Sequence, residues 1–553
     1  MGNPLLVTLN LTVTSAGRQF DRLGYMYFND TEIFRTSTAE PIQTGIEWSY
    51  MKDVSNYLAL FKKPQKIIFD LGNLVDDTYT GTFNVTLTAT FFTDPYPLPA
   101  ADVVLAVSAR HSSINGSSAF VIPTDNASTT LNIPLNAKKA IFTISACGQF
   151  LEEFWFTNVP SSTVQTFPDT ELLGHSPFRE LQLYIDGILA GVSWPFPVIF
   201  TGGIVPGLWR PIVGIDAFDL REDEIDVTPF LPLLVDGNAH NFEIRVVGIY
   251  DDGTGNAILT ENVDDYWVVT GKLFLWQDDT ENIAAGAAPV IVAPEPTLRL
   301  SSSVTTDVNG TNETLSYNVS VERYISVSSL VNAPCGPRPV SWQQALAFTN
   351  TGMLTDRGRV QVTHQRSTGL DVSSNDYSRT FAYPLFVNSS FSTDDESGNF
   401  SIAATISRGK EVRVIGSNVF PTDQLDSTKR SSDLSPTLTG THLNTVQNGS
   451  ATYLAAPKLK YAVGHGATEQ DLIFSTSEGF QPPLRNQQMY GPERDYRFYR
   501  RHVLAVNGTL VEDDEMIRGH ENERKARQAY QAGRTEYCVR EGVGRMLGRG
   551  PRL

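Results

Sequence analysis

The chain has 553 residues, a formal net charge of -18 and a sequence pI of about 4.9. A single hydrophobic core does not grow to this length, so two to four domains are expected. A polyanionic surface repels phosphate backbones, so nucleic acid is not expected as a partner. Charged residues make up only 19% of the chain, and Gly (42) and Pro (31) are frequent. This composition favours antiparallel β-structure with polar loops.

Residues 1–96 predict a first β-sandwich of the jelly-roll type. The segment Val7–Thr14 alternates apolar and polar residues, as a half-buried strand does. Further strand-like runs are bounded by Asn, Asp, Gly and Pro, and they lie at Leu23–Phe28, Ile33–Phe34, Ile46–Tyr50, Lys66–Leu71 and Phe83–Phe92. Several short strands at close spacing are typical of sandwiches and jelly rolls.

Three further regions follow along the chain. The proline-rich segment Asp94–Ala101 marks a boundary, after which residues 97–292 resume the strand pattern and predict a second jelly roll in tandem with the first. The Ala- and Pro-rich segment Ala284–Pro296 marks the next boundary. Residues 293–512 then predict a third, β-rich domain with a structural role. Residues 513–553 are charged, and we expect a helical or disordered tail there. The fold class is therefore all-β.

Cysteines and sequons bear on cofactors and compartment. Cys147, Cys335 and Cys538 make neither a disulfide framework nor a metal quartet, and we expect no metal or cofactor. The many Asn-X-Ser/Thr sequons favour a secreted or vacuolar protein that is itself N-glycosylated. They lie at Asn10, Asn29, Asn84, Asn115, Asn126, Asn309, Asn312, Asn318, Asn388, Asn399, Asn448 and Asn507. The start of the chain has no signal-peptide pattern, so we expect that a leader is missing. No apolar run is long enough for a transmembrane helix, and no membrane insertion is expected.

The segment Gly17–Arg22 carries the first candidate site. It places Arg18, Asp21 and Arg22 around Phe20, which is expected to be buried and to anchor its strand. This is the pattern of a polar site on a β-framework, and we predict that Asp21 does chemistry there. The alternative is a structural pair of Asp21 with a neighbouring arginine.

Ordered motifs over residues 7–250 resemble the peptide-N-glycosidase A family of plants and fungi. They are Gly17–Arg22, Arg35–Pro41, Gly72–Asn73, Thr78–Gly81, Glu153–Pro160, Pro177–Glu180, Ile185–Gly187, Trp194–Gly203 and Trp209–Pro211, with weaker matches at Arg494–Tyr496 and Val506–Gly508. The resemblance implies a fungal-type amidase that cleaves the bond from asparagine to the first N-acetylglucosamine of an N-glycan. The more distantly similar bacterial peptide-N-glycosidase F implies two side-by-side jelly rolls with the site at their junction. A glutamate expected near Asn73 and Asp76 is absent from this sequence.

Amide hydrolysis without a metal can use a carboxylate as general base on water, and we assign this role to Asp21. The resemblance assigns Glu153 as the second acidic residue. If Leu151–Trp155 is a strand, Glu153 and Trp155 share one face and suit a sugar, with Glu152 on the other face as the competitor. The alternative is an ordinary surface glutamate beside a core tryptophan. Asp21 and Glu153 must then face one cleft where the two jelly rolls meet.

Other residues are expected to hold the N-glycopeptide substrate. The predicted binding residues are Arg18, Arg22, Glu40, Trp48, Asn73, Asp76, Glu152, Trp155, Arg179, Glu180, Trp209 and Arg210. Two alternatives stay open at this point. Trp194 and Trp209 are either stacking walls for sugar or packing anchors. Glu40 either reaches into a cleft or pairs with Arg35.

Other function classes have less support in the sequence. The histidines show no nucleophile-elbow context, and no Gly-X-Ser-X-Gly, Walker or HExxH motif occurs. A glycosidase with Asp21 and Glu153 as its carboxylate pair remains an alternative, and the separation of the two groups bears on it. The rival from another class is a non-catalytic glycan-binding or cell-wall protein. Such a protein would need the tryptophans more than Asp21.

Overall fold

The structure is a computed structural model of the whole chain. It describes residues 5–93, 100–278, 286–333, 336–374, 377–394, 396–416, 419–421, 440–459, 461–476, 497–517 and 520–525. These residues form antiparallel sheets with short 3-10 turns and a single four-residue α-helix among the described segments, α1 (Leu231–Leu234), so the all-β class is confirmed. No helix in these segments is long and apolar enough to cross a membrane.

Residues 5–93, here called the first unit, form two three-stranded sheets, and residues 103–277 are called the second unit. The first has the order β4-β1-β6, with β1 at Leu5–Ser15, β4 at Ile46–Asp53 and β6 at Asn84–Thr93. The second has the order β3-β2-β5, with β2 at Leu23–Phe28, β3 at Thr31–Ser37 and β5 at Ile67–Leu71. Alternate residues of β1, such as Val7 and Leu9, are buried, as the alternation predicted.

Residues 103–277 form two five-stranded sheets packed face to face. One has the order β13-β10-β16-β7, and β8 also pairs with β16. Its strands are Asp223–Asp226 (β13), Ala137–Gly148 (β10), Trp267–Gln277 (β16), Val103–Val107 (β7) and Phe120–Ile122 (β8). The other has the order β12-β11-β14-β15, and β9 also pairs with β14. Its strands are Ile188–Ser193 (β12), Glu180–Ile185 (β11), Ala239–Asp251 (β14), Ala257–Thr260 (β15) and Ser128–Asn132 (β9). The rings of Phe142 on β10 and Phe242 on β14 stack at 5.8 Å between the layers.

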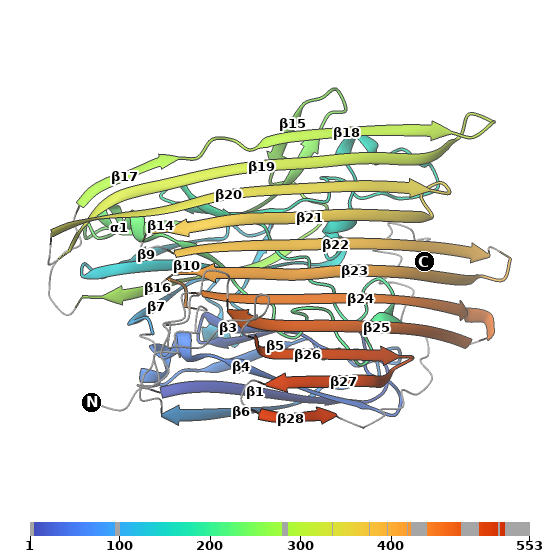
Figure 1. Ribbon diagram of the computed structural model, residues 1–553, viewed down its shortest axis with the longest axis horizontal. Coiled ribbons are helices and arrows are strands. Elements are labelled where there is room, and N and C mark those ends of the chain that lie inside the picture. The colour runs from blue at the N-terminus through green and yellow to red at the C-terminus, as the bar shows by residue number, and fades with distance from the viewer. Residues whose placement is uncertain are drawn as a thin grey trace, which may run out of the picture.

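The rest of the described chain forms one twelve-stranded antiparallel sheet, here called the large sheet, which fills the front of Figure 1. Its order is β17-β19-β20-β21-β22-β23-β24-β25-β26-β27-β28, and β18 also pairs with β19. The strands are Gly286–Val292 (β17), Thr297–Thr306 (β18), Asn312–Ala333 (β19), Gly336–Thr355 (β20), Val360–Ser373 (β21), Tyr377–Asp394 (β22), Asn399–Ile415 (β23), Gly440–Ala456 (β24), Tyr461–Thr476 (β25), Arg497–Val506 (β26), Thr509–Ile517 (β27) and His520–Lys525 (β28).

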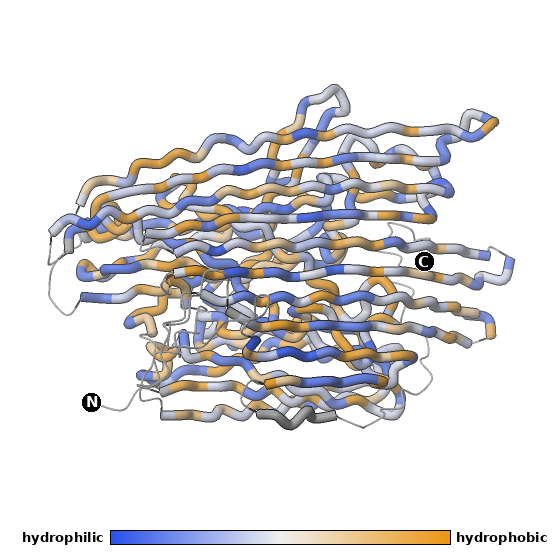
Figure 2. The backbone as a smooth tube through the Cα atoms, in the orientation of Figure 1, coloured by the Kyte–Doolittle hydropathy of each residue, from blue (hydrophilic) through white to orange (hydrophobic). Residues whose placement is uncertain are grey.

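One face of the large sheet packs on the unit formed by residues 103–277. Buried and exposed residues alternate along strands such as β20. Figure 2 shows hydrophobic and hydrophilic residues interspersed along the strands of this sheet. Gln344 on β20 exchanges two hydrogen bonds of 2.9 Å with the backbone of Val192 on β12. The Tyr317 hydroxyl on β19 donates to the carbonyl of Asn158 at 3.1 Å. The large sheet is therefore joined to the second unit by buried polar contacts as well as apolar ones.

The tail expectation is wrong for residues 513–525. Residues 509–525 form β27 and β28 at the edge of the large sheet, where Arg501 on β26 pairs with Asp513 on β27 at 2.9 Å. Edge strands commonly carry charged side chains, so a high charge density does not exclude a strand there. Residues 526–553 lie outside the described residues, as do Arg494–Tyr496, Cys335 and Cys538.

Candidate active site at the junction of the first two units

Asp21 lies in the loop that joins β1 to β2. Gln19, two residues earlier, is fully buried, and its side-chain amide donates to the carbonyls of Leu74 (2.7 Å) and Gly81 (3.2 Å). The side-chain oxygen Oε1 of Gln19 in turn accepts from the Arg22 guanidinium at 2.8 Å. These bonds fix the backbone on both sides of Asp21. Phe20, which the sequence predicted to be the buried residue, is half-exposed and packs against Tyr79 instead.

A glycine of the second unit brings Asp21 and Glu40 together. The backbone N–H of Gly202 donates to Oδ2 of Asp21 at 3.0 Å. A Cβ atom at Gly202 would lie 2.7 Å from Oε1 of Glu40 and 3.0 Å from Oδ1 of Asp21. A side chain at this position would displace at least one of the two carboxylates. Two acidic side chains of the first unit therefore face the same point of the second.

Glu40 is anchored across the same junction. Its Oε2 accepts from Nη2 of Arg210 at 2.9 Å, and its backbone N–H donates to Oγ1 of Thr201 at 3.2 Å. The alternative pairing of Glu40 with Arg35 does not occur. Arg35 instead forms a bidentate pair with Glu32 at 2.8 Å for both bonds. Glu40 is thus the acidic side chain that links the first unit to a cation of the second.

Burial shifts both carboxyl groups toward the neutral form. Burial raises the pKa of Glu40 to about 8; the Arg210 guanidinium opposes the shift and the Asp21 charge adds to it. Burial also raises the pKa of Asp21, opposed by the Gly202 N–H and by the Arg22 charge. Two carboxyl groups that share one site cannot easily both ionise, and their titration belongs to the pair. With the Glu40 pKa raised to about 8, the pair retains a proton at neutral pH. The Gly202 and Arg22 contacts favour a charged Asp21, and the Arg210 contact favours a charged Glu40.

Glu153 lies on a turn and not on the expected strand. Strand β10 ends at Gly148, and the chain continues as 3-10 turns at Phe150–Glu152 and Trp155–Thr157. A Cβ atom at Gly148 would lie 2.3 Å from the carbonyl oxygen of Glu152, so the chain folds back over this glycine. The strand alternation that placed Glu153 beside Trp155 on one face is therefore wrong.

Glu153 nevertheless lies close to the junction. It is half-buried, and Phe154 next to it is in contact with Gly203, the neighbour of the Gly202 that binds Asp21. Burial raises the pKa of the Cys147 thiol to about 12, and the Arg35 charge opposes this shift. The Glu153 charge adds to the increase, so Glu153 lies close enough to Cys147 to affect it. The segments of Asp21 and Glu153 thus meet successive residues of one loop, through Gly202 and Phe154. That the two carboxylates face one cleft stays a prediction.

Four predicted binding residues lie in the interior of the second unit. Glu152 is fully buried and pairs with the buried Arg179 through bonds of 2.6 and 2.5 Å. Trp155 packs against Trp267, whose indole N–H donates to Glu152 at 2.7 Å. Glu180 is fully buried as well and accepts from the indole of Trp194 at 3.0 Å. Side chains with these partners do not reach a substrate, so their assignment as binding residues is corrected, and Trp194 is a packing anchor.

Neutralising Glu152 tests this structural role. The variant Glu152→Gln should lower the free energy of unfolding by about 3–5 kcal/mol, because it leaves the Arg179 charge buried without an ionised partner. Denaturant unfolding measures the loss. The exposed pair of Arg359 and Asp356 (2.6 Å) provides the control, since Arg359→Met should cost only about 0–1 kcal/mol. A Glu152→Gln protein as stable as wild type would contradict the assignment.

Three further candidates have local structural roles. The side chain of Asn73 bonds the backbone of Phe83, accepting from its N–H at 3.1 Å. Asp76 accepts from the N–H groups of Thr78 and Tyr79 at 2.7 Å, which closes a turn. Trp209 is buried, and its indole donates to the Gly203 carbonyl at 2.6 Å, so it packs as an anchor and offers no stacking face.

The two remaining candidates lie at the rim of the first unit. Trp48 on β4 is half-exposed and stacks on Phe218 at 6.0 Å. The Arg18 backbone N–H donates to Oγ1 of Thr80 at 3.1 Å, which ties the Asp21 loop to the neighbouring loop. The structure thus places Asp21, Arg22, Glu40 and Arg210 together, with Glu153 nearby.

Comparison with known proteins identifies the family. The profile of the family described as peptide N-acetyl-β-D-glucosaminyl asparaginase amidase A matches residues 5–291, which is more than half of the chain. The chain belongs to the peptide-N-glycosidase A family. The C-terminal domain of the same family matches residues 316–385, so the family extends into the large sheet.

Comparisons with individual proteins gave three further similarities. The peptide-N4-(N-acetyl-beta-glucosaminyl)asparagine amidase A of Prunus dulcis is 31% identical over 377 residues, and the match covers 65% of this chain and 62% of that protein. Two solved structures of PNGF-II, in the P21 and C2 space groups, align with a TM-score of 0.33 at 13% and 14% identity. They cover 50% and 51% of this chain and 58% of theirs. Alignments this loose do not establish a common fold.

Sequence reasoning missed two residues of the site. Gln19 is a polar residue between Arg18 and Phe20, and nothing in that pattern shows that it is buried. Gly202 was part of a family-like motif, but its role depends on which carboxylates approach it. Adjacent glycines at Gly202 and Gly203 are the one available signal, because paired glycines often mark a close approach of the backbone.

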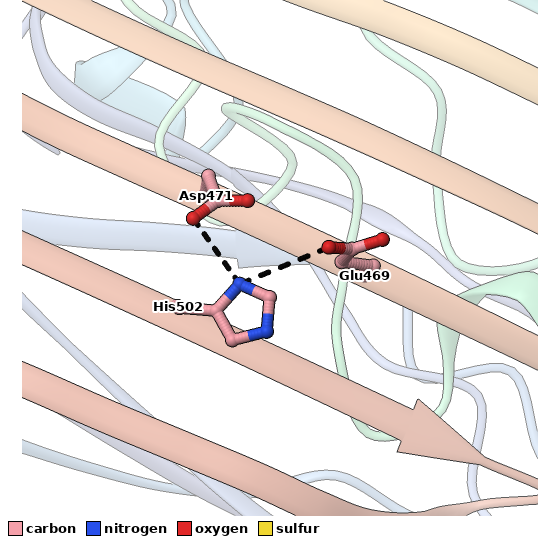
Figure 3. Close-up of side chains that lie close together, drawn as sticks. All are labelled: Glu469, Asp471 and His502. Atoms are coloured by element: carbon pink, nitrogen blue, oxygen red, sulfur yellow. Dashed lines mark hydrogen bonds and ion pairs between the residues drawn. The ribbon is translucent and has the colours of Figure 1, made fainter.

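Glu469, Asp471 and His502 form a group of metal-ligating side chains on β25 and β26 (Figure 3). Nδ1 of His502 lies 3.1 Å from Asp471 and 3.9 Å from Glu469, and Arg500 lies 3.6 Å from Asp471. Asp471 and His502 are directly opposite each other in the strand pairing. Cross-strand ion pairing explains this group, and the nearby arginine disfavours a cation. It does not support a metal centre.

Proposed function

We propose that this protein is an amidase that hydrolyses the bond between an asparagine side chain and N-acetylglucosamine, releasing the intact N-glycan and leaving aspartate. The observation that carries the proposal is the carboxyl pair of Asp21 and Glu40, held at Gly202 where the two units meet. Both units lie within the part of the chain that matches the family. The Prunus dulcis relative bears the name of such an amidase, and the chain spans 62% of its length.

The pair supplies the elements of the reaction. Water attacks the side-chain amide carbon, and ionised Asp21 accepts the proton from that water. The C–N bond then breaks, and the proton is delivered to the leaving nitrogen, so the products are an aspartate-containing peptide and a glycosylamine. Glu40 keeps its own proton near neutral pH and so lets Asp21 carry the charge. Glu153 is assigned as the second acidic residue, and it binds the sugar with Arg22 and Arg210.

Glycan release from a denatured glycopeptide tests the proposal. Reaction in water labelled with heavy oxygen should place one label in the new aspartate, as amide hydrolysis requires. Cleavage inside the glycan without labelled aspartate would favour the glycosidase alternative. Tight binding with no cleavage would favour the non-catalytic glycan-binding protein.

The same proposal extends to scaffold and compartment. The sheets of residues 5–93 and 103–277 are proposed to be two jelly rolls side by side, which supports a site at their junction. A protein of the secretory pathway, secreted or vacuolar, is proposed because the sequons are numerous. All twelve sequon asparagines are exposed or half-exposed, which supports N-glycans on the protein itself.

The glycans on the protein can be mapped directly. We expect mass spectrometry of the eukaryotically expressed protein to find glycans at exposed strand positions such as Asn318 and Asn388. The inactive Asp21→Asn variant should be used, because an active amidase could remove glycans from itself. Peptides free of glycan at every sequon in this variant would contradict the proposed compartment.

A further inference from the structure

Residues 194–216, the first part of the connection between β12 and β13 and here called the junction loop, lie between the carboxyl pair and the large sheet. On one side Gly202 donates to Asp21, and Arg210 pairs with Glu40. On the other side its backbone carbonyls accept hydrogen bonds from the large sheet. The donors are Arg408 to Pro197 (2.6 Å), Thr468 to Leu208 (2.6 Å) and Gln447 to Val213 (2.8 Å).

The three donors come from three neighbouring strands and are all buried. Arg408 lies on β23, Gln447 on β24 and Thr468 on β25, each less than 4% exposed. The backbones also approach closely, since a Cβ atom at Gly466 would lie 2.3 Å from the Gly207 carbonyl oxygen. Side chains and close packing together fix the back of the junction loop against the large sheet.

Arg408 is the member of this set whose burial most opposes folding. Its guanidinium stacks over the Phe196 ring at 4.8 Å, yet neither Nε nor Nη1 has a hydrogen-bond partner in the described part of the chain. Burial lowers the pKa of Arg408 to about 9, and the charge of Asp216 opposes this only in part. A buried charge with so few partners opposes folding, and an apolar side chain of similar volume is often neutral or stabilising in its place. Stability alone does not explain an arginine here.

We propose that Arg408 is a positioning residue for the hydrolysis. With Gln447 and Thr468 it holds the junction loop so that the Gly202 N–H points at Asp21 and Arg210 reaches Glu40. The large sheet then contributes to catalysis by holding the junction loop in place, and it is not only an added structural domain. This inference rests on the proposed function for its catalytic consequence, while the positioning of the loop can be measured separately.

The variant Arg408→Met tests the catalytic consequence in the full-length protein. We expect an unchanged or higher unfolding temperature, together with a kcat lower by roughly 10- to 100-fold, because small misplacements of catalytic groups are costly. Loss of the Gly202 contact removes an interaction that favours ionised Asp21. The acid limb of the pH profile should therefore move to higher pH. Arg408→Lys, which can still donate to Pro197, should recover part of the rate.

Arg323→Met is the matched control. Arg323 is also a buried arginine of the large sheet, but it donates to Pro294 (3.0 Å), outside the junction loop, and lies 3.7 Å from Glu180. This variant should lose stability and keep the wild-type acid limb. A purely structural role for Arg408 would make the two variants behave alike.

Hydrogen exchange of the backbone separates this inference from the proposed function. Amides of residues 199–210 should exchange faster in Arg408→Met than in wild type or Arg323→Met. Unchanged exchange, or a wild-type kcat and acid limb in an active enzyme, would overturn the proposal. Faster exchange in a protein whose wild type releases no glycan would refute the amidase assignment and leave the positioning of the loop standing.

Discussion

Replacing Asp21 with asparagine should strongly slow glycan release and leave the protein folded. Asparagine cannot accept the proton from the attacking water, and general base catalysis contributes about 10²–10⁴-fold to a rate. Its side-chain carbonyl can still accept from the Gly202 N–H, and a neutral amide avoids the desolvation that burial imposes on the Asp21 charge. We therefore expect kcat to fall by about that factor, with an unfolding temperature equal to or above wild type.

The comparison needs a carboxylate that is unrelated to the site. Asp252 is an exposed turn residue that accepts from the Thr254 N–H at 2.8 Å, so Asp252→Asn should retain the wild-type rate. Release and stability should be measured on the same preparations. Full activity of Asp21→Asn would remove Asp21 from the mechanism, whereas loss of activity together with loss of the fold would point to the structural Asp–Arg alternative.

The strands of the first unit could be predicted from the sequence, but the course of the chain after β10 could not. Alternation along Val7–Thr14 locates β1 because one face of that strand is buried. The same argument failed at Glu153 because Gly148 ends its strand and lets the chain turn back at once. A local pattern predicts a strand only where the chain has room to continue as one.

Buried charge was the other limit of sequence reasoning. Arg179 and Glu152 resemble surface residues in composition, but their partner lies 27 positions away and both are enclosed. Arg408 contacts a carbonyl 211 positions away, so its role depends wholly on tertiary structure. By contrast, Asp21 could be singled out because several polar side chains surround it within six residues. What the sequence could not provide was its neighbour, Glu40, and the glycine that joins the two.

Substituting Glu40 with glutamine should change the pH dependence of the reaction more than its maximal rate. Burial raises the pKa of Glu40 to about 8, so the proton that lets Asp21 carry the single charge is lost as the pH rises through that value. Above about pH 8 Glu40 is ionised as well, and its added negative charge opposes the developing oxyanion, so wild-type activity should decline. Glutamine resembles the protonated acid and cannot lose that proton. Glu40→Gln should lose this alkaline limb while keeping a substantial part of the rate near neutral pH.

The pH dependence of protein stability should show the titration of Glu40 independently of catalysis. A carboxyl group whose folded pKa is raised stabilises the fold below its unfolded pKa, near 4.5, and this contribution is lost as the pH rises toward 8. Wild type should thus lose stability across this window relative to Glu40→Gln. Thermal unfolding at several pH values, beside the pH profile of kcat, measures both effects. An unchanged alkaline limb in Glu40→Gln, with parallel stability curves, would show that Glu40 does not hold the proton and that the carboxyl pair does not share one.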